Sequence, residues 1–350
     1  MSIALITGSC GLVGSESSIF FSKKGFDIIG IDNNARKFFF GKDGDISWIK
    51  TKLKKNLKKY KHYDTDIRNY DALEKIFLKY KKNIKLIIHA AAQPSHDWAK
   101  NKPIIDFDIN AKGTLNLLEL TKLYCPEAPF IFMSTNKVYG DNPNKLPLIE
   151  TKSRWEIKNA HKYKVGIDES MSIDNCTHSF FGASKAYADI IVQEYGKNVG
   201  LKTTCFRAGC ITGPNHSGAK LHGFLSYLVK ASLKIKKYSL IGYKGKQVRD
   251  NIHSSDLVNC FWEFYKKPSR GKIYNAGGGR FSNCSILEAL NIVEENAGIT
   301  VKKNVLRANR IGDHIWYISS MKKFKKDYPK WKQKYSTKKI INELIEQFTT

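Results

Sequence analysis

The feature that most constrains the fold is a glycine-rich loop near the start of the chain. A short apolar run at residues 2–7 leads directly into the sequence TGSCGLVG at residues 7–14, and an amphipathic segment follows. Glycines at positions 8, 11 and 14 permit a tight turn in which the backbone approaches a ligand closely. A helix that opens after such a loop presents its positive N-terminus to an anion. Strand, glycine loop and helix in this order are typical of the first unit of a dinucleotide-binding sheet.

An acidic residue ends the next apolar run. Asp32 lies eighteen residues beyond Gly14, where a carboxylate can accept hydrogen bonds from the ribose hydroxyls of NAD. Its charge would repel the 2′-phosphate of NADP, although Arg36 nearby leaves NADP open. The glycine spacing is GxxGxxG rather than GxGxxG. We predict that NAD is the cofactor.

Apolar runs and amphipathic stretches alternate through the first part of the chain. Expected strands lie at residues 2–7, 27–31, 86–89, 129–134 and 202–207, and expected helices at residues 12–24, 70–80, 106–124 and 179–198. This alternation predicts an α/β fold, a Rossmann-type doubly wound parallel sheet covered on both faces. Beyond residue 209 the pattern loosens, which predicts a smaller α/β C-terminal lobe. We expect an NAD-binding lobe at residues 1–208 and a substrate-binding lobe at residues 209–350, with segments exchanged between them.

The charge of the chain bears on its partners. The 350 residues carry a formal net charge of +27, with 59 Lys and Arg against 32 Asp and Glu. A nucleic-acid partner would explain this excess. Arginine is sparse and no nucleic-acid-binding motif is present, so lysines spread over solvated helix faces are the favoured interpretation. A positive surface would also attract an anionic small-molecule substrate.

Cysteine usage and hydropathy indicate the compartment. The seven cysteines are scattered and include no CxxC pair, which argues against a disulfide framework or a structural zinc site. No apolar run approaches the roughly 20 residues needed to span a bilayer, and the N-terminal residues lack the pattern of a secretory signal. We expect a cytoplasmic protein with no metal and no membrane partner.

Further motifs occur in an order that carries a family resemblance. After TGSCGLVG come DIR at 66–68, HAAAQ at 89–93, NAKGT at 110–114, STNKVYG at 134–140, GASK at 182–185, QVRDNIH at 247–253 and RIGD at 310–313. The set resembles the extended short-chain dehydrogenase/reductases, and more narrowly the NAD-dependent epimerases and dehydratases that act on nucleotide-sugars. The STNKVYG segment is similar to that of the CDP-paratose (CDP-tyvelose) 2-epimerase group. The resemblance covers nearly the whole chain.

This resemblance implies a set of cofactor-binding residues. Pyrophosphate would be held by Gly8, Gly11, Leu12, Val13 and Gly14. The adenosine ribose would contact Asp32 and Asn33, and the adenine would lie between Asp66 and Ile67. The rest of the cofactor would be lined by Ala90, Ala91, Gln93 and Asn110, with Lys185 on the nicotinamide ribose.

One position departs from the family pattern at the centre of the chemistry. The family places a tyrosine four residues before the lysine that corresponds to Lys185, and this chain has Phe181 there. Phenylalanine has no proton to exchange, so another group must act as the acid–base catalyst, or the protein binds without catalysing. Lys137 is the first candidate, because it follows Thr135 at the end of an expected strand. Other titratable groups in the region are His96, Asp97 and His178.

The resemblance also implies a substrate and a reaction. Thr135 would orient the reacting sugar hydroxyl, while Arg249 and Arg310 would hold the nucleotide diphosphate and Asn215 would shape the pocket. The implied activity is that of a nucleotide-sugar epimerase that abstracts a hydride transiently and returns it, with Thr135, Lys137 and Lys185 as its catalytic residues. A nucleotide-sugar 4,6-dehydratase and, because of Phe181, an NAD-binding pseudoenzyme stay open, as does a homodimer.

Overall fold

A computed structural model describes residues 2–216, 218, 223–306 and 312–349. The chain divides into two compact units. Unit 1 comprises residues 1–138, 180–207 and 258–274, and unit 2 comprises residues 139–179, 208–257 and 275–350.

A seven-stranded sheet forms the centre of unit 1 in the described part of the chain. The strand order is β12-β8-β5-β4-β1-β2-β3, and the pairings β5–β4, β4–β1, β1–β2 and β2–β3 are parallel. The strands are β1 (Ile3–Thr7), β2 (Asp27–Ile31), β3 (Tyr60–Tyr63), β4 (Ile84–His89), β5 (Phe130–Thr135), β8 (Thr203–Ala208) and β12 (Lys272–Ala276). Because the strand order reverses beside β1, the carboxyl end of β1 is the place where such sheets bind ligands.

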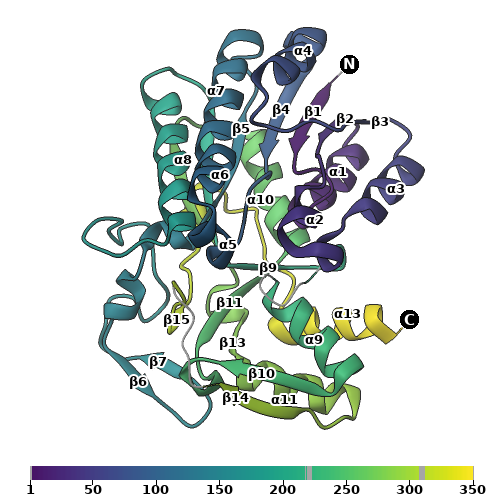
Figure 1. Cartoon of the computed structure of the whole chain (residues 1–350). Helices are drawn as coiled ribbons and strands as arrows, with labels where there is room; N and C mark the ends of the chain where they lie inside the picture. Colours follow the sequence, from purple (N-terminus) through teal and green to yellow (C-terminus); the bar gives the residue numbers. More distant parts are fainter. Residues whose placement is uncertain (1, 217, 219–222, 307–311, 350) are drawn as a thin grey trace. The chain divides into compact units, whose positions relative to one another are not determined.

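Helices cover both faces of this sheet (Figure 1). On one face α4, α7 and α8 pack in sequence, and on the other α1 packs beside α3. In α4 the buried residues Leu73, Ile76, Phe77 and Tyr80 recur at the spacing of one helical face, which explains why this segment is a helix against the sheet. The helices of unit 1 are α1 (Leu12–Lys23), α2 (Ala35–Phe40), α3 (Ser47–Asn56), α4 (Tyr70–Tyr80), α5 (His96–Asn101), α6 (Pro103–Phe107), α7 (Gly113–Tyr124), α8 (Phe180–Lys197) and, from residue 258 on, α10 (Ser254–Lys266).

The predicted parallel α/β sheet is confirmed, and two of its strands escaped prediction. All five expected strands and all four expected helices are present within a few residues of their expected bounds. The sequence did not reveal β3, because this edge strand reads YKHY and is only partly buried, nor β12, which begins at an exposed lysine. The helix expected at residues 106–124 starts earlier, at Pro103, and contains a π-helical segment at Asp108–Lys112.

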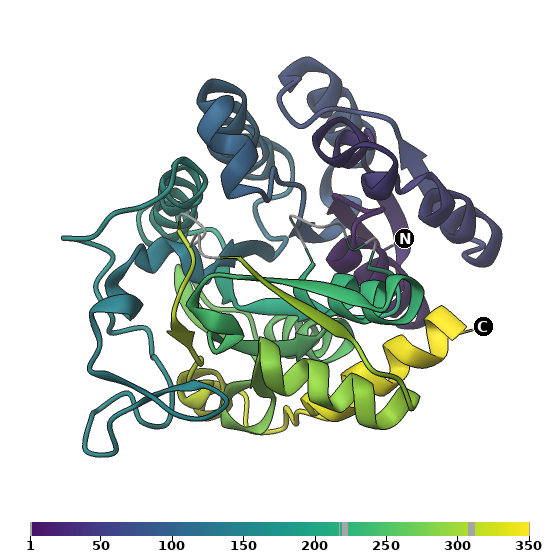
Figure 2. The same cartoon turned by 60° about the horizontal axis from the view of Figure 1, so that its bottom comes forward.

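Unit 2 consists of smaller sheets and helices around its own core. A sheet formed by β13, β11, β15 and β9 lies at its centre, and β10 pairs with β14 and β6 with β7. Figure 2 shows the C-terminal helix α13 alongside α11, and α9 also packs on α13. The elements are β6 (Leu148–Glu150), β7 (Trp155–Ile157), β9 (Cys210–Thr212), β10 (Lys237–Ile241), β11 (Val248–His253), β13 (Asn283–Ser285), β14 (Lys302–Leu306), β15 (Trp316–Tyr317), α9 (Phe224–Ile235), α11 (Ile286–Ala297), α12 (Lys322–Asp327) and α13 (Thr337–Thr349).

We expected one boundary after residue 208 with segments exchanged between the lobes. Two segments lie on the other side of this boundary in the structure. Residues 139–179 belong to unit 2, where the Gly140 carbonyl accepts a hydrogen bond from His314 Nε2 and Ile167 bridges to Ser319. Residues 258–274 belong to unit 1, because α10 packs on α1 through aromatic contacts such as that between Phe21 and Tyr265.

Candidate active site

The glycine loop forms a cradle at the carboxyl end of β1. Gly8 has a φ of +65°, and a Cβ there would lie 2.7 to 2.8 Å from the backbone of Ala90 and Ala91. A Cβ on Gly14 would lie 2.0 Å from the Gly8 carbonyl oxygen. Gly11 is the N-cap of α1 and has no side chain with which to cap the first-turn amides. These amides are therefore available to an anion, and the residues fit the pyrophosphate of a dinucleotide.

Leu12 and Val13, the other predicted phosphate-loop residues, open α1. Both are half-buried in the first turn of the helix. Their backbone amides are among those that an α-helix leaves without an intrahelical partner. The predicted pyrophosphate residues thus form one continuous loop and helix start.

Asp32 lies where the sequence predicted a ribose-binding carboxylate. Its Oδ2 accepts a hydrogen bond from the Cys10 amide at 2.9 Å and its Oδ1 accepts one from the Asn34 amide at 2.8 Å. Burial raises the pKa of this carboxyl, while the two amides oppose the rise. Asp32 therefore fixes the glycine loop against the segment after β2, with oxygen lone pairs left for ribose hydroxyls.

The predicted adenine-side residues lie next to Asp32 in unit 1. Asn33 Nδ2 donates to Asp66 Oδ2 at 3.0 Å, and Arg68 forms an ion pair with the same carboxylate at 2.7 Å. Ile67 is buried, and its backbone oxygen accepts a hydrogen bond from Asn116. The structure thus brings Asn33, Asp66 and Ile67 together at the ends of β2 and β3.

A chain of buried hydrogen bonds connects the glycine loop to Asn110. Thr114 Oγ1 donates to the Asn110 carbonyl at 2.6 Å, so its single proton is used there. His89 Nε2, 3.0 Å from Thr114 Oγ1, must therefore be the donor of that bond, and its Nδ1 accepts from Thr7 Oγ1 at 2.7 Å. Burial and the charge of Lys185 lower the pKa of His89 well below its usual value, which agrees with a neutral ring.

Residues after β4 extend this chain toward the cofactor loop. The Ala91 amide donates to Thr7 Oγ1 at 3.3 Å, and the Ala90 amide donates to the Thr7 carbonyl at 3.2 Å. Ala90 and Ala91, both predicted to line the cofactor, therefore lie directly beside Gly8.

Asp106 is the centre of a second buried network, which the sequence did not reveal. Its Oδ1 accepts hydrogen bonds from Gln93 Nε2 at 2.6 Å and Asn110 Nδ2 at 3.0 Å. Its Oδ2 accepts one from Ser184 Oγ at 2.6 Å. Burial raises the pKa of this carboxyl, against the effect of the Ser184 and Gln93 hydrogen bonds. Two predicted cofactor residues, Gln93 and Asn110, are thus held by one carboxylate together with the start of α8.

Lys185 is buried within unit 1. Its Nζ donates to the Met133 carbonyl of β5 at 2.7 Å and lies 4.1 Å from the centroid of the Phe132 ring. Burial lowers the pKa of Lys185 to about 8, although Asp189 opposes this. Asp189, one helical turn further on, binds Arg207 Nη2 at 2.8 Å and accepts a hydrogen bond from Ser134 Oγ at 2.5 Å. A lysine so poorly solvated is typical of a functional position.

Lys185 is expected to make stability depend on pH. Its folded-state pKa of about 8 lies below the usual 10.5, so between these values the unfolded chain binds more protons and the free energy of unfolding rises with pH. From pH 7 to pH 10 the wild type should gain about 2 kcal/mol relative to Lys185→Met. Urea unfolding of both proteins without added cofactor measures this difference. Parallel pH curves for the two proteins would contradict the expectation.

The predicted catalytic residues Thr135 and Lys137 lie at the end of β5. Thr135 Oγ1 accepts a hydrogen bond from the Lys137 amide at 3.2 Å and donates to Asn136 Oδ1 at 3.4 Å. Thr135 and the Lys137 side chain are both half-buried. Phe181, at the family's tyrosine position, is buried, and its ring contacts the His96 ring with a centroid distance of 5.0 Å.

Arg249, a predicted diphosphate ligand, lies on β11 of unit 2. Its guanidinium is 2.6 Å from Asp313 Oδ1 and donates to the His314 carbonyl at 2.6 Å. Asn215, predicted to shape the pocket, is buried in the same unit. Arg310 lies outside the described residues.

Asp250, the neighbour of Arg249, has a structural role. Its carboxylate is fully buried and accepts hydrogen bonds from the Ser319 amide at 2.7 Å and the Gly278 amide at 2.9 Å. A Cβ on Gly277 would collide with the Asp250 oxygens at 2.2 Å. Asp250 therefore ties β11 to the segments after β12 and β15.

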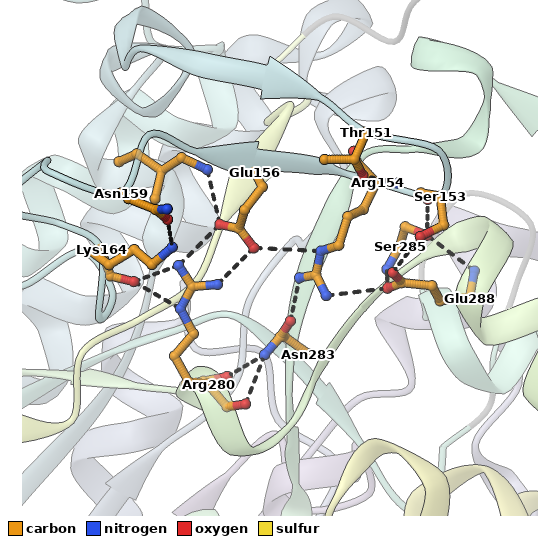
Figure 3. A network of polar contacts seen from close by, with 12 residues as sticks. Thr151, Ser153, Arg154, Glu156, Asn159, Lys164, Arg280, Asn283, Ser285 and Glu288 are labelled. Atoms are coloured by element: carbon orange, nitrogen blue, oxygen red, sulfur yellow. Dashed lines mark hydrogen bonds and ion pairs between the residues drawn. The ribbon is translucent and has the colours of Figure 1, made fainter.

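A polar network holds the β6–β7 segment in unit 2 (Figure 3). Glu156 accepts hydrogen bonds from both terminal nitrogens of Arg280 at 2.8 and 3.0 Å. Arg154 contacts Glu288 at 3.4 Å, and Glu288 forms a capping box with Ser285 at the start of α11. The network fixes residues that lie between β5 and α8 in the sequence.

The fold and the glycine loop define a dinucleotide-binding α/β protein. A model of the NAD dependent epimerase/dehydratase family matches residues 4–277, and the chain belongs to this family. The cofactor is NAD.

Comparisons with individual proteins agree with the family. The CDP-paratose 2-epimerase of Salmonella typhi is 30% identical over 348 residues, 98% of each chain. The dTDP-glucose 4,6-dehydratase of Bacillus anthracis, solved in complex with NAD, has a TM-score of 0.78 at 22% identity, covering 100% of this chain and 97% of its own. The UDP-glucose 4-epimerase of Thermus thermophilus, also with NAD, has a TM-score of 0.77 at 24% identity, covering 99% of both chains. Relatives are thus nucleotide-sugar epimerases and dehydratases.

Two kinds of feature are absent from the described residues, a membrane-spanning helix and a metal-binding cluster. None of their helices is long and apolar enough to cross a membrane. Within the same residues, no group of three or more His, Cys, Asp or Glu side chains could hold a metal ion.

Proposed function

We propose that this protein is a nucleotide-sugar epimerase of the CDP-paratose 2-epimerase type. The observation that carries the proposal is the similarity to the Salmonella typhi enzyme, at 30% identity along 98% of both chains. The half-buried pair Thr135 and Lys137 and the buried Lys185 supply polar groups for chemistry in unit 1.

The residues of the chain divide the work as follows. Asp32 and the glycine loop bind NAD, which supplies an acceptor and donor of hydride when bound. Thr135 orients the reacting hydroxyl, and Lys185 favours charge separation next to it. Arg249 and Arg310 hold the diphosphate through guanidinium hydrogen bonds while the sugar turns over. Lys137 is the first candidate from the sequence for the group that transfers the proton.

A direct assay separates this function from its alternatives. Purified protein is incubated with CDP-paratose and with other CDP-, UDP- and dTDP-sugars, and the products are analysed by mass spectrometry and NMR. An epimerase gives a product of unchanged mass with inverted stereochemistry. Loss of water identifies a 4,6-dehydratase. Absence of any reaction supports the NAD-binding pseudoenzyme that Phe181 keeps open.

Arg249 provides a test of the substrate-binding residues. Arg249→Ala should raise KM for the nucleotide-sugar by at least about tenfold, because a hydrogen bond to a charged group contributes roughly 1.5–3 kcal/mol. The Kd of NAD should stay unchanged, since Arg249 lies in unit 2 and the cofactor loop in unit 1. Steady-state kinetics and calorimetry measure the two constants.

The matched control is Arg280→Ala, which also removes a guanidinium from an ion pair within unit 2. This variant should leave KM close to the wild-type value. An equal loss of NAD binding in Arg249→Ala would show that the assignment of Arg249 to the substrate is wrong.

A further inference from the structure

His96 and Phe181 form a direct contact at the position where the family has its catalytic tyrosine. The two rings meet edge to face, with centroids 5.0 Å apart and an interplanar angle of 72°. Phe181 is buried, whereas His96 is half-buried. His96 therefore places a group that exchanges protons beside an aromatic ring that cannot.

The backbone before His96 and the start of α8 are anchored to the same buried carboxylate. The amide of Ser95, the N-cap of α5, donates to Gln93 Oε1 at 2.5 Å, and Gln93 Nε2 donates to Asp106 at 2.6 Å. Ser184 Oγ donates to Asp106 at 2.6 Å and lies 3.1 Å from the Phe181 carbonyl. Gln93 and Ser184 thus both donate to Asp106. These hydrogen bonds hold the backbone before His96 and the start of α8 near Phe181 in place.

A second aromatic contact, made by Trp98, also holds the short helix α5. Trp98 packs against Phe39, which follows β2, with ring centroids 4.8 Å apart. Strand β1 lies between β2 and β4 in the sheet. Helix α5, which follows β4, therefore makes contacts on both sides of the carboxyl end of β1, where NAD binds in this fold.

We propose that His96 is the acid–base catalyst that replaces the missing tyrosine. This rests on the proposed epimerase function. NAD, when bound, would supply the acceptor and later the donor of the hydride. In the first step the sugar carbon would give up its hydride and the hydroxyl proton would pass to the His96 imidazole, so that one C–H and one O–H bond break and a C=O bond forms. In the return step the hydride would return to the opposite face of this carbonyl and the imidazolium would return its proton, so no electrons are gained or lost overall.

His96 suits this role better than Lys137 for a reason visible in the contacts. The step needs a group that accepts a proton and then donates it at near-neutral pH, and an imidazole does both. His96 also contacts the residue that stands in for the tyrosine. Lys137 lies two residues beyond Thr135, just after the end of β5, and is the alternative that the test must exclude.

The test compares His96→Ala, alone and combined with Phe181→Tyr, with the wild type on CDP-paratose or on the nucleotide-sugar that the wild type turns over best. His96→Ala should lose about 10²–10⁴-fold in turnover, keep its bound NAD and keep the Kd of the nucleotide-sugar. Free imidazole should restore its turnover by at least about tenfold, as expected when a missing proton-transfer group is supplied from solution. Adding Phe181→Tyr to His96→Ala should also restore turnover, because it recreates the tyrosine four residues before Lys185.

Controls distinguish the loss of a catalytic group from a loss of folding. His161 is a half-buried histidine of unit 2. The variant His161→Ala should therefore retain wild-type turnover and should not respond to imidazole. NAD content and thermal stability of each variant report folding, and His96→Gln replaces His96→Ala if the latter loses NAD.

Three outcomes would contradict the proposal. Wild-type turnover in both His96 variants, together with its loss in Lys137→Met, would assign the proton to Lys137 and overturn the proposal. Loss of turnover in the His96 variants without rescue by imidazole or by Phe181→Tyr would also overturn it. If the wild type itself converts no nucleotide-sugar, the proposed function fails and this proposal fails with it.

Discussion

Gly14→Ala is expected to abolish NAD binding. A Cβ at this position would lie 2.0 Å from the Gly8 carbonyl oxygen and 2.7 Å from the Ser9 Cα. Both atoms belong to backbone, so neither can swing away as a flexible side chain would. The loop must therefore shift as a whole, and the first-turn amides of α1 lose the positions from which they bind pyrophosphate. We expect the Kd of NAD to rise by about a hundredfold or more and stability to fall by about 2 kcal/mol.

Gly11→Ala is the graded control in the same loop. A Cβ on Gly11 would lie 3.3 Å from the Gly8 carbonyl oxygen, a distance that a shift of a few tenths of an ångström relieves. Its effect on the Kd of NAD should accordingly be much smaller than that of Gly14→Ala. Calorimetric titration of NAD into both variants measures the difference. Equal affinities in the two would show that the close approach at Gly14 is not what forms the site.

The sequence predicted those parts of the molecule that depend on local pattern. The strands from β1 to β8 that were found are rich in apolar residues and almost entirely buried, because both faces of a covered parallel sheet are buried. The glycine loop and Asp32 lie within one strand-helix-strand unit, so their spacing alone was enough to predict that they bind the cofactor. The edge strand β3 was missed because its sequence contains the polar residues Lys61 and His62 and is not an apolar run.

What escaped prediction depends on contacts between distant parts of the chain. Ser184 reaches Asp106 across 78 positions of sequence, and Lys185 reaches the Met133 carbonyl across 52. Nothing in the local sequence distinguishes the buried Asp106 from the half-buried Asp97 and Asp108 near it. The contact between His96 and Phe181 is of the same kind, whereas Lys137 could be named as a candidate because it is close to Thr135 along the chain.

The electrostatics of unit 1 and unit 2 differ in how buried charges are balanced. In unit 1 the buried Asp189 pairs with Arg207, while the Lys185 ammonium contacts the Met133 carbonyl and the Phe132 ring. In unit 2 the buried Asp250 is balanced by backbone amides and Ser319. An amide-bound carboxylate fixes loops without presenting a charge to a ligand, which agrees with a structural role for Asp250.

Asp106→Ala is expected to reduce both stability and turnover. The change removes the acceptor of Gln93 Nε2, Asn110 Nδ2 and Ser184 Oγ, three donors in a buried region. Each keeps a second partner, so we expect a loss of about 3 kcal/mol in the free energy of unfolding rather than the larger cost of fully orphaned groups. Urea unfolding measures this loss.

The kinetics of Asp106→Ala test whether Asp106 is a positioning residue. Since Asp106 holds Gln93 before His96 and Ser184 beside Phe181 and Lys185, its loss should lower kcat by at least about tenfold while KM changes less. Asp106→Asn keeps an acceptor oxygen for Gln93 and Asn110 and should recover most of kcat and of stability. Asp108→Asn, two residues on and outside the network, should resemble the wild type. If Asp106→Ala keeps wild-type kcat despite its lost stability, the network supports only the fold, and the arrangement of His96 against Phe181 must be maintained by the helix contacts of α5 alone.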